Sequence, residues 1–64
     1  MKQSDAVRAF VRLGGMERAG KGSHRVVNLN GRNLAIPYGT LKEGLLRHLI
    51  KTAGLTPDDF LKAL

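Results

Sequence analysis

The chain has no cysteine and no tryptophan, and only one tyrosine and two phenylalanines. Without cysteine, disulfides and thiolate metal sites are excluded, and a reducing compartment is favoured. The shortage of aromatic side chains disfavours a base-stacking surface like that of RRM or OB domains. No apolar run approaches the ~18 residues that would span a bilayer, and no signal-peptide pattern opens the chain. We therefore expect a cytoplasmic protein that does not associate with membranes.

Acidic residues are also scarce. Five Asp and Glu stand against eleven Lys and Arg, which gives a net charge of +6. On a chain of 64 residues, enough for one domain over residues 1–64, this excess favours a polyanionic partner. The alternative is that the charge serves solubility alone. With two widely separated histidines, the chain shows no usual metal-ligand spacing, so we expect neither a metal nor another cofactor.

Three strands are expected in the middle of the chain, at about residues 16–19, 24–29 and 32–36. The dipeptide Asn30-Gly31 between the last two is the strongest short hairpin signal that a sequence offers. A two-residue turn there fixes the register and sorts the side chains by face. The core face then carries Val27, Leu29, Leu34 and Ile36. His24 falls on the opposite face and is expected to point away from the core.

Three helices are expected around these strands. Ser4 is the expected N-cap of the first helix, and a capping box of Thr40 and Glu43 predicts the start of the second. Thr56 is expected to cap a third, with Pro57 in its first position. The order α-β-β-β-α-α predicts a small α+β domain, in which helices cover one face of a three-stranded antiparallel sheet.

The densest functional signal is the segment Lys21-Gly22-Ser23-His24. Glycine lets backbone N–H groups approach an anion closely, while the serine hydroxyl and the lysine add a donor and a charge, so this segment can seat a phosphate. Imidazole exchanges protons near neutral pH, and RNA supplies its own nucleophile, the 2′-hydroxyl. His24 could therefore cleave RNA as a general base or acid. The alternative is an ordinary turn followed by a surface histidine without catalytic duty.

Other side chains give weaker signals. Tyr38 could donate to a phosphate or stack on a base, or it could be partly packed at a loop rim. His48 lies at the margin of the apolar stripe of the second helix, where packing or solvation is the simpler interpretation. Each basic residue alone could be a solvated charge, but together they are candidate phosphate contacts: Arg8, Arg12, Arg18, Arg25, Lys42, Arg47 and Lys51.

Several short motifs follow one another in an order and spacing that are quite specific as a set. They are Gly22-Ser23-His24 opening a strand, Asn30-Gly31-Arg32 at the hairpin, Ile36-Pro37 closing the third strand, Gly39 to Arg47, and Lys51 to Thr56, followed by Phe60. Over nearly its whole length the chain thus resembles the HicA toxins, also called YcfA-like proteins.

The resemblance implies a fold similar to double-stranded-RNA-binding domains and ribosome-independent cleavage of mRNA. It implies that Gly22-Ser23-His24 is the active-site signature, with His24 essential. Tyr38 stands where many relatives have a histidine, and a phenol there is a poor base but a workable donor. The expected partner is a HicB antitoxin that covers the site, so that a monomeric toxin enters a hetero-oligomer.

The leading hypothesis is therefore a type II toxin, an mRNA interferase that acts as a metal-independent endoribonuclease in the stress response. His24 would be its catalytic residue. The residues expected to contact RNA or its phosphates are Lys21, Gly22, Ser23, Arg25, Arg18 and Tyr38. A non-catalytic basic RNA-binding module is one alternative. A protein-binding domain whose basic face docks an acidic partner is another.

Overall fold

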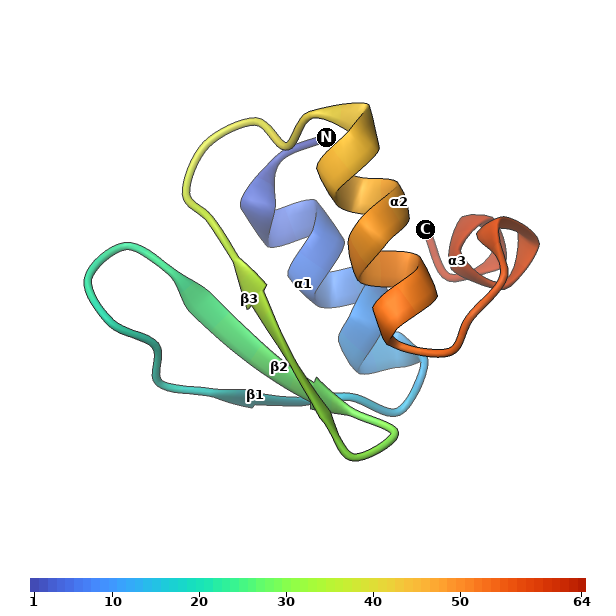
Figure 1. The fold of residues 1–64 in the computed structure, drawn as a ribbon, viewed down its shortest axis with the longest axis horizontal. Coiled ribbons are helices and arrows are strands. Elements are labelled where there is room, and N and C mark those ends of the chain that lie inside the picture. Colours follow the sequence, from blue (N-terminus) through green and yellow to red (C-terminus); the bar gives the residue numbers. More distant parts are fainter.

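The structure of the protein, a computed structural model, describes residues 1–64 and has the element order α1–β1–β2–β3–α2–α3 (Figure 1). The elements are α1 (Gln3–Arg12), β1 (Met16–Arg18), β2 (Arg25–Leu29), β3 (Arg32–Ile36), α2 (Glu43–Thr52) and α3 (Pro57–Lys62). The strands pair antiparallel in the order β1-β2-β3. The predicted α+β class and element order are confirmed.

The β2–β3 hairpin has the predicted register. Asn30 and Gly31 adopt φ angles of 54° and 75°, the left-handed conformations that a type I′ turn requires at both central positions. Val27 consequently pairs with Leu34. The four side chains assigned to the core face, Val27, Leu29, Leu34 and Ile36, are all buried. The face assignment made from the turn is therefore confirmed.

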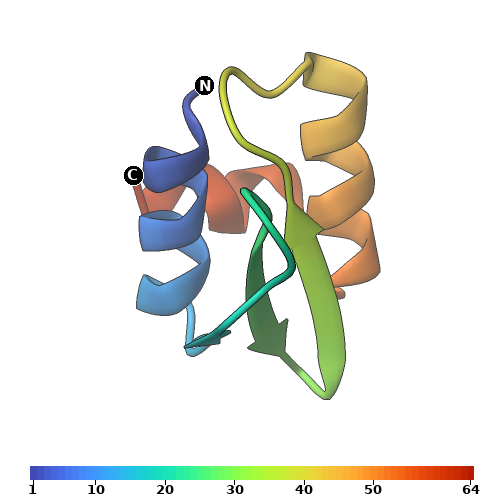
Figure 2. The same ribbon diagram turned by 90° about the vertical axis from the view of Figure 1, so that its left-hand side faces the viewer.

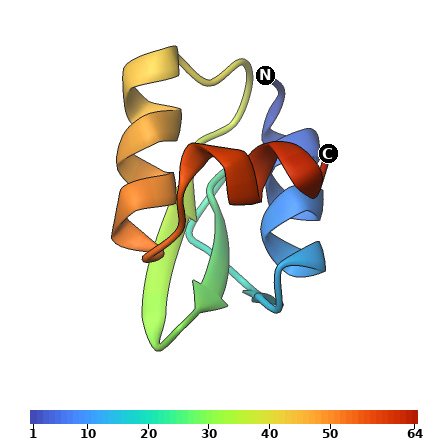
Figure 3. The same cartoon turned by 90° about the vertical axis from the view of Figure 1, so that its right-hand side faces the viewer.

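The helices lie on one side of the sheet and enclose the core (Figure 1). α1 and α2 lie apart on this side of the sheet, and α3 lies across between them (Figures 2 and 3). The rings of Phe10 and Phe60 join α1 to α3, with centroids 5.0 Å apart. None of the helices is long and apolar enough to pass through a membrane. The other face of the sheet carries no helix and stays open.

Two of the predicted helix caps are wrong. α1 begins at Gln3 with Lys2 as its N-cap, two residues earlier than a Ser4 cap requires, and no side chain caps it. α2 begins at Glu43 with Lys42 as its N-cap, so the predicted box of Thr40 and Glu43 does not form.

The predicted caps of α1 and α2 do not form because the N-terminus pairs with a distant segment of the chain. Thr40 forms an isolated antiparallel bridge with Lys2, and the backbone N–H of Leu41 donates to the carbonyl oxygen of Met1 at 2.7 Å. These contacts hold the chain before α2 in an extended conformation. The third cap forms as predicted, because Thr56 is the N-cap of α3 and Pro57 stands at the helix start. The structure adds that Thr56 and Asp59 exchange hydrogen bonds as a capping box.

Candidate functional site

His24 is the residue directly before β2, at the end of the β1–β2 loop. Its side chain is exposed and takes no part in the buried core, in agreement with the face assignment. The backbone N–H of His24 donates to the carbonyl oxygen of Lys21 at 3.2 Å, which closes a tight turn. Within this turn Gly22 has a φ of 59°, a left-handed conformation that glycine adopts without strain. The four residues from Lys21 to His24 are all exposed.

Gln3 holds this turn in place, and the sequence analysis missed it. It is a buried polar residue with 9% of its surface exposed. Its Nε2 donates to the carbonyl oxygen of Ser23 at 2.8 Å and to that of Ile36 at 2.9 Å. The first turn of α1 therefore binds both the loop before His24 and the end of β3. Since the partners are 20 and 33 residues away, no local pattern could have revealed this role.

Gly20 supports His24 by close packing, and it too was missed. A Cβ at Gly20 would meet the carbonyl oxygen of His24 and lie 2.9 Å from its carbonyl carbon, with Val26 Cγ2 at 3.3 Å. Any larger residue would push the His24 backbone away. At Gly22, by contrast, a Cβ would meet nothing within 4 Å, so only the φ angle favours glycine there.

The β3–α2 loop, which carries Tyr38, lies at the same end of the sheet as the β1–β2 loop (Figure 1). The side chain of Tyr38 is 77% exposed. The loop is fixed to α1 because the backbone N–H of Gln3 donates to the carbonyl oxygen of Gly39 at 2.9 Å. Tyr38 and the turn ending at His24 therefore belong to one end of the molecule and share Gln3 as a common support.

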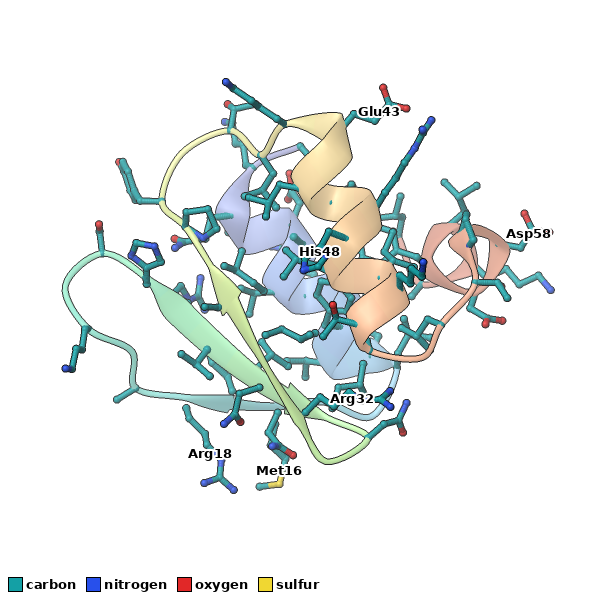
Figure 4. All side chains as sticks on the ribbon, viewed as in Figure 1. Met16, Arg18, Arg32, Glu43, His48 and Asp58 are labelled. Atoms are coloured by element: carbon teal, nitrogen blue, oxygen red, sulfur yellow. The ribbon has the colours of Figure 1, made fainter.

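The two arginines predicted to contact RNA lie on opposite faces of the sheet. Arg18 pairs with Val26 in the register and projects from the open face (Figure 4). Arg25 pairs with the buried Ile36 and points toward α1. Its guanidinium binds the carboxylate of Glu17 through two hydrogen bonds of 2.6 and 2.8 Å. The structure thus keeps Arg18 and Arg25 apart.

The Arg25–Glu17 contact also shifts the titration of both groups. The hydrogen bonds from Arg25, aided by the attraction of its charge, hold the pKa of Glu17 below its ordinary value. The same contact raises the pKa of Arg25. Arg25 is therefore engaged by a carboxylate in the free protein, and an RNA phosphate would have to compete with Glu17 for it.

The lysines and arginines differ in whether a carboxylate pairs with them. Ion pairs join Arg8 to Asp5, Arg25 to Glu17 and Arg47 to Glu43, and the other lysines and arginines have no acidic partner. Arg18 ends β1 and Lys21 lies in the β1–β2 loop, while Lys42 directly precedes α2 and Lys2 lies beside Tyr38. His48 lies on α2, exposed and apart from the β1–β2 loop (Figure 4). No three His, Asp or Glu side chains come together in a way that could hold a metal ion.

These features define a small basic α+β domain with an exposed histidine beside a glycine-containing turn. A family model described as HicA toxin of bacterial toxin-antitoxin matches residues 4–55 of the 64-residue chain. The chain belongs to the HicA toxin family. It is thus a toxin of a toxin–antitoxin system, a role that implies an antitoxin partner. A comparison with curated proteins found no match.

Proposed function

We propose that this toxin is a metal-independent endoribonuclease that cleaves mRNA with His24 as its catalytic residue. The observation that carries the proposal is the position of His24. The residue is exposed and directly follows the Lys21–Ser23 turn; Gln3 binds the carbonyl oxygen of Ser23 before it, and Gly20 packs against its own carbonyl group. An accessible imidazole next to a seat for an anion is what proton transfer at a phosphodiester needs.

The proposed reaction is an internal transfer within the RNA. The 2′-hydroxyl loses its proton, its oxygen attacks the adjacent phosphorus, and the bond from phosphorus to the 5′-oxygen breaks. The leaving oxygen takes up a proton, so the products are a 2′,3′-cyclic phosphate and a 5′-hydroxyl end. His24 performs one of these two proton transfers, a contribution worth about 10²–10⁴-fold in rate.

Binding of the reacting phosphate is assigned to the turn. Lys21 supplies a positive charge that no carboxylate neutralises, and Ser23 supplies a hydroxyl donor. Gly22 adopts a left-handed conformation without strain and has no side chain that would separate the backbone from the anion. Charge stabilisation here adds to the proton transfer by His24.

A defined RNA oligonucleotide tests the chemistry. The purified toxin is expected to cleave it in the presence of EDTA and to leave cyclic phosphate ends. The same oligonucleotide with a single 2′-deoxynucleotide at the mapped cleavage position should stay intact, because the nucleophile is missing. Loss of cleavage in EDTA would contradict the metal-independent mechanism. Cleavage at the deoxynucleotide would contradict attack by the 2′-hydroxyl.

The proposal includes the partner and the place of action. The antitoxin is a HicB protein that covers the His24 end of the molecule, and the monomeric toxin joins it in a hetero-oligomer in the cytoplasm. The exposure of Lys21, His24 and Tyr38 supports this arrangement, because all three are accessible in the free chain. Added antitoxin should stop cleavage and raise the mass of the toxin measured by light scattering.

A non-catalytic RNA-binding module remains the second candidate, because the net charge of +6 and the unpaired cations would suffice for it. Both candidates predict binding that weakens with salt, with a logarithmic slope of about −0.7 per phosphate contacted on a single strand. Salt dependence therefore does not separate them. Turnover of RNA does.

A further inference from the structure

We propose that a hollow between the start of α1 and the β3–α2 loop is a subsite for one unpaired nucleotide, with Tyr38 stacking on its base. This nucleotide adjoins the phosphate bound by the Lys21–His24 turn. The inference rests on the proposed RNA cleavage and adds the substrate class, which is single-stranded or looped RNA.

The hollow is polar and free of negative charge. It has a volume of about 350 Å³ and is lined by Lys2, Gln3, Ser4, Tyr38, Gly39 and Thr40. Three of these side chains are hydroxyl donors and one is a lysine, whereas none is a carboxylate. Its volume lies at the lower end of the range typical of small-ligand sites, roughly 300–1,000 Å³. Such a lining suits the ribose and phosphate oxygens of a single nucleotide.

Tyr38 is the one exposed side chain among the phenylalanines and the tyrosine. Phe10 and Phe60 are buried and pack against each other in the core. Tyr38, by contrast, is 77% exposed and lines the hollow. Stacking of bases on aromatic side chains is a common and sequence-tolerant way to bind single strands. A base can reach such a ring only after it leaves its duplex stack, which is why the site selects unpaired RNA.

The hollow and the loop before His24 share one residue, Gln3. Gln3 forms part of its wall, and the Gln3 amide binds the carbonyl oxygen of Ser23, directly before His24. The same amide binds the carbonyl oxygen of Ile36, two residues before Tyr38. The two loops are therefore held as neighbours by one side chain. We therefore assign the hollow to the nucleotide next to the phosphate that rests on the turn.

A second hollow, of about 320 Å³, lies on the other side of Ser4 and fits RNA less well. It is lined by Ser4, Val7, Arg8, Val11, Arg12, Glu17 and Arg25. The carboxylate of Glu17 lies within it and already binds Arg25. Arg12 donates to the carbonyl oxygen of Ala63. Its cations are thus largely occupied, which favours the Tyr38 hollow as the nucleotide site.

Fluorescent RNA tests the stacking directly. The oligonucleotide carries a 2′-deoxynucleotide at the cleavage position, so that binding is measured without turnover, and 2-aminopurine at each flanking position in turn. At one flanking position, binding of the unaltered toxin should quench the fluorescence. Tyr38→Leu should abolish the quenching and weaken single-strand binding by roughly 5- to 100-fold. Tyr38→Phe, which keeps the ring, should retain both the quenching and the single-strand affinity.

Charge provides the matched control. Lys2→Ala and Lys62→Ala remove the same charge, but Lys62 lies on α3 and does not line the hollow. Lys2→Ala should weaken single-strand binding more than Lys62→Ala does. A duplex of the same sequence should bind equally well to the Tyr38→Leu variant and to the unaltered toxin.

Several results would contradict the proposal that this hollow binds a nucleotide. Quenching that persists in Tyr38→Leu, or single-strand affinity that this variant leaves unchanged, would remove it while the cleavage proposal stood. Tyr38→Leu that weakens only the antitoxin complex would make the hollow a protein-docking site. If the unaltered toxin bound no RNA at all, the proposed function would fail together with the subsite.

Discussion

The side-chain amide of Gln3 donates a hydrogen bond to the carbonyl oxygen of Ser23, with 2.8 Å between nitrogen and oxygen. A second bond from the same nitrogen reaches the carbonyl oxygen of Ile36 at 2.9 Å. One buried side chain therefore connects α1, the loop before His24 and the end of β3. In a domain whose core contains only 13 buried apolar residues, such a polar connection fixes loops that packing alone would leave loose.

Replacing Gln3 by leucine should destabilise the protein by about 1–3 kcal/mol, because the Ile36 carbonyl loses its donor in a buried environment and the Ser23 carbonyl loses its donor in a partly buried one. Urea unfolding measures the loss, and hydrogen exchange at His24 reports on the loop. Ser4→Ala is the control, since Ser4 is exposed and makes no cap bond, and it should stay within about 0.5 kcal/mol. Equal effects of the two substitutions would contradict the bridging role of Gln3.

Replacing Gly20 by alanine should displace His24 and reduce cleavage strongly, because the added methyl group meets the His24 backbone. Crowding of this kind typically costs about 1–3 kcal/mol in stability. Gly44→Ala is the matched change: Gly44 lies exposed in α2, where a Cβ meets nothing. It should raise stability by up to about 1 kcal/mol. Thermal unfolding and a cleavage assay on both variants check this, and a fully active Gly20→Ala variant would refute the packing argument.

Acid should weaken the start of α3. The hydrogen bond that the backbone N–H of Thr56 donates to the Asp59 carboxylate, followed by a contribution of the Thr56 side chain, holds the pKa of Asp59 below its ordinary value of 3.8. Because the folded-state pKa is the lower one, this stabilisation is present above pH 3.8 and is lost as the pH falls through the folded-state pKa. In Asp59→Asn the residue no longer titrates. The urea midpoint of this variant should fall less between pH 7 and pH 2 than that of the unaltered protein, and parallel falls would contradict the assignment.

Lys21 should contribute one phosphate contact to RNA binding. Lys21→Ala is therefore expected to weaken single-strand binding and to reduce the logarithmic salt slope by about 0.7. Lys51→Ala, on the last turn of α2, removes the same charge far from the turn and should leave that slope nearly unchanged. Fluorescence anisotropy over a salt series measures both. Identical slopes for the two variants would show that Lys21 has no specific contact.

Most of the fold could be predicted from signals between residues that are close in the sequence. Asn30-Gly31 determined the hairpin register, and the register placed Val27 inside and His24 outside. The Thr56 cap was predictable for the same reason, since its partner Asp59 is three residues away. In such cases the interacting groups lie next to each other in the chain, so their spacing alone predicts the contact.

Interactions between distant segments could not be predicted in this way. The Thr40 cap was wrong because Lys2 pairs with Thr40 across the structure. Gln3 gave no signal because its hydrogen bonds reach residues 20 and 33 positions along the chain. The split of Arg18 and Arg25 between two faces followed from the strand register, but the capture of Arg25 by Glu17 needed the β1–β2 pairing as well.

The central claim is that His24 transfers a proton in RNA cleavage, and a comparison of the two histidines tests it most directly. His24→Ala and His48→Ala each remove one exposed imidazole, and both variants should unfold like the unaltered protein. Initial rates on the same RNA should fall by about 10²-fold or more for His24→Ala and by less than about twofold for His48→Ala. Undiminished cleavage by a folded His24→Ala protein would contradict the claim.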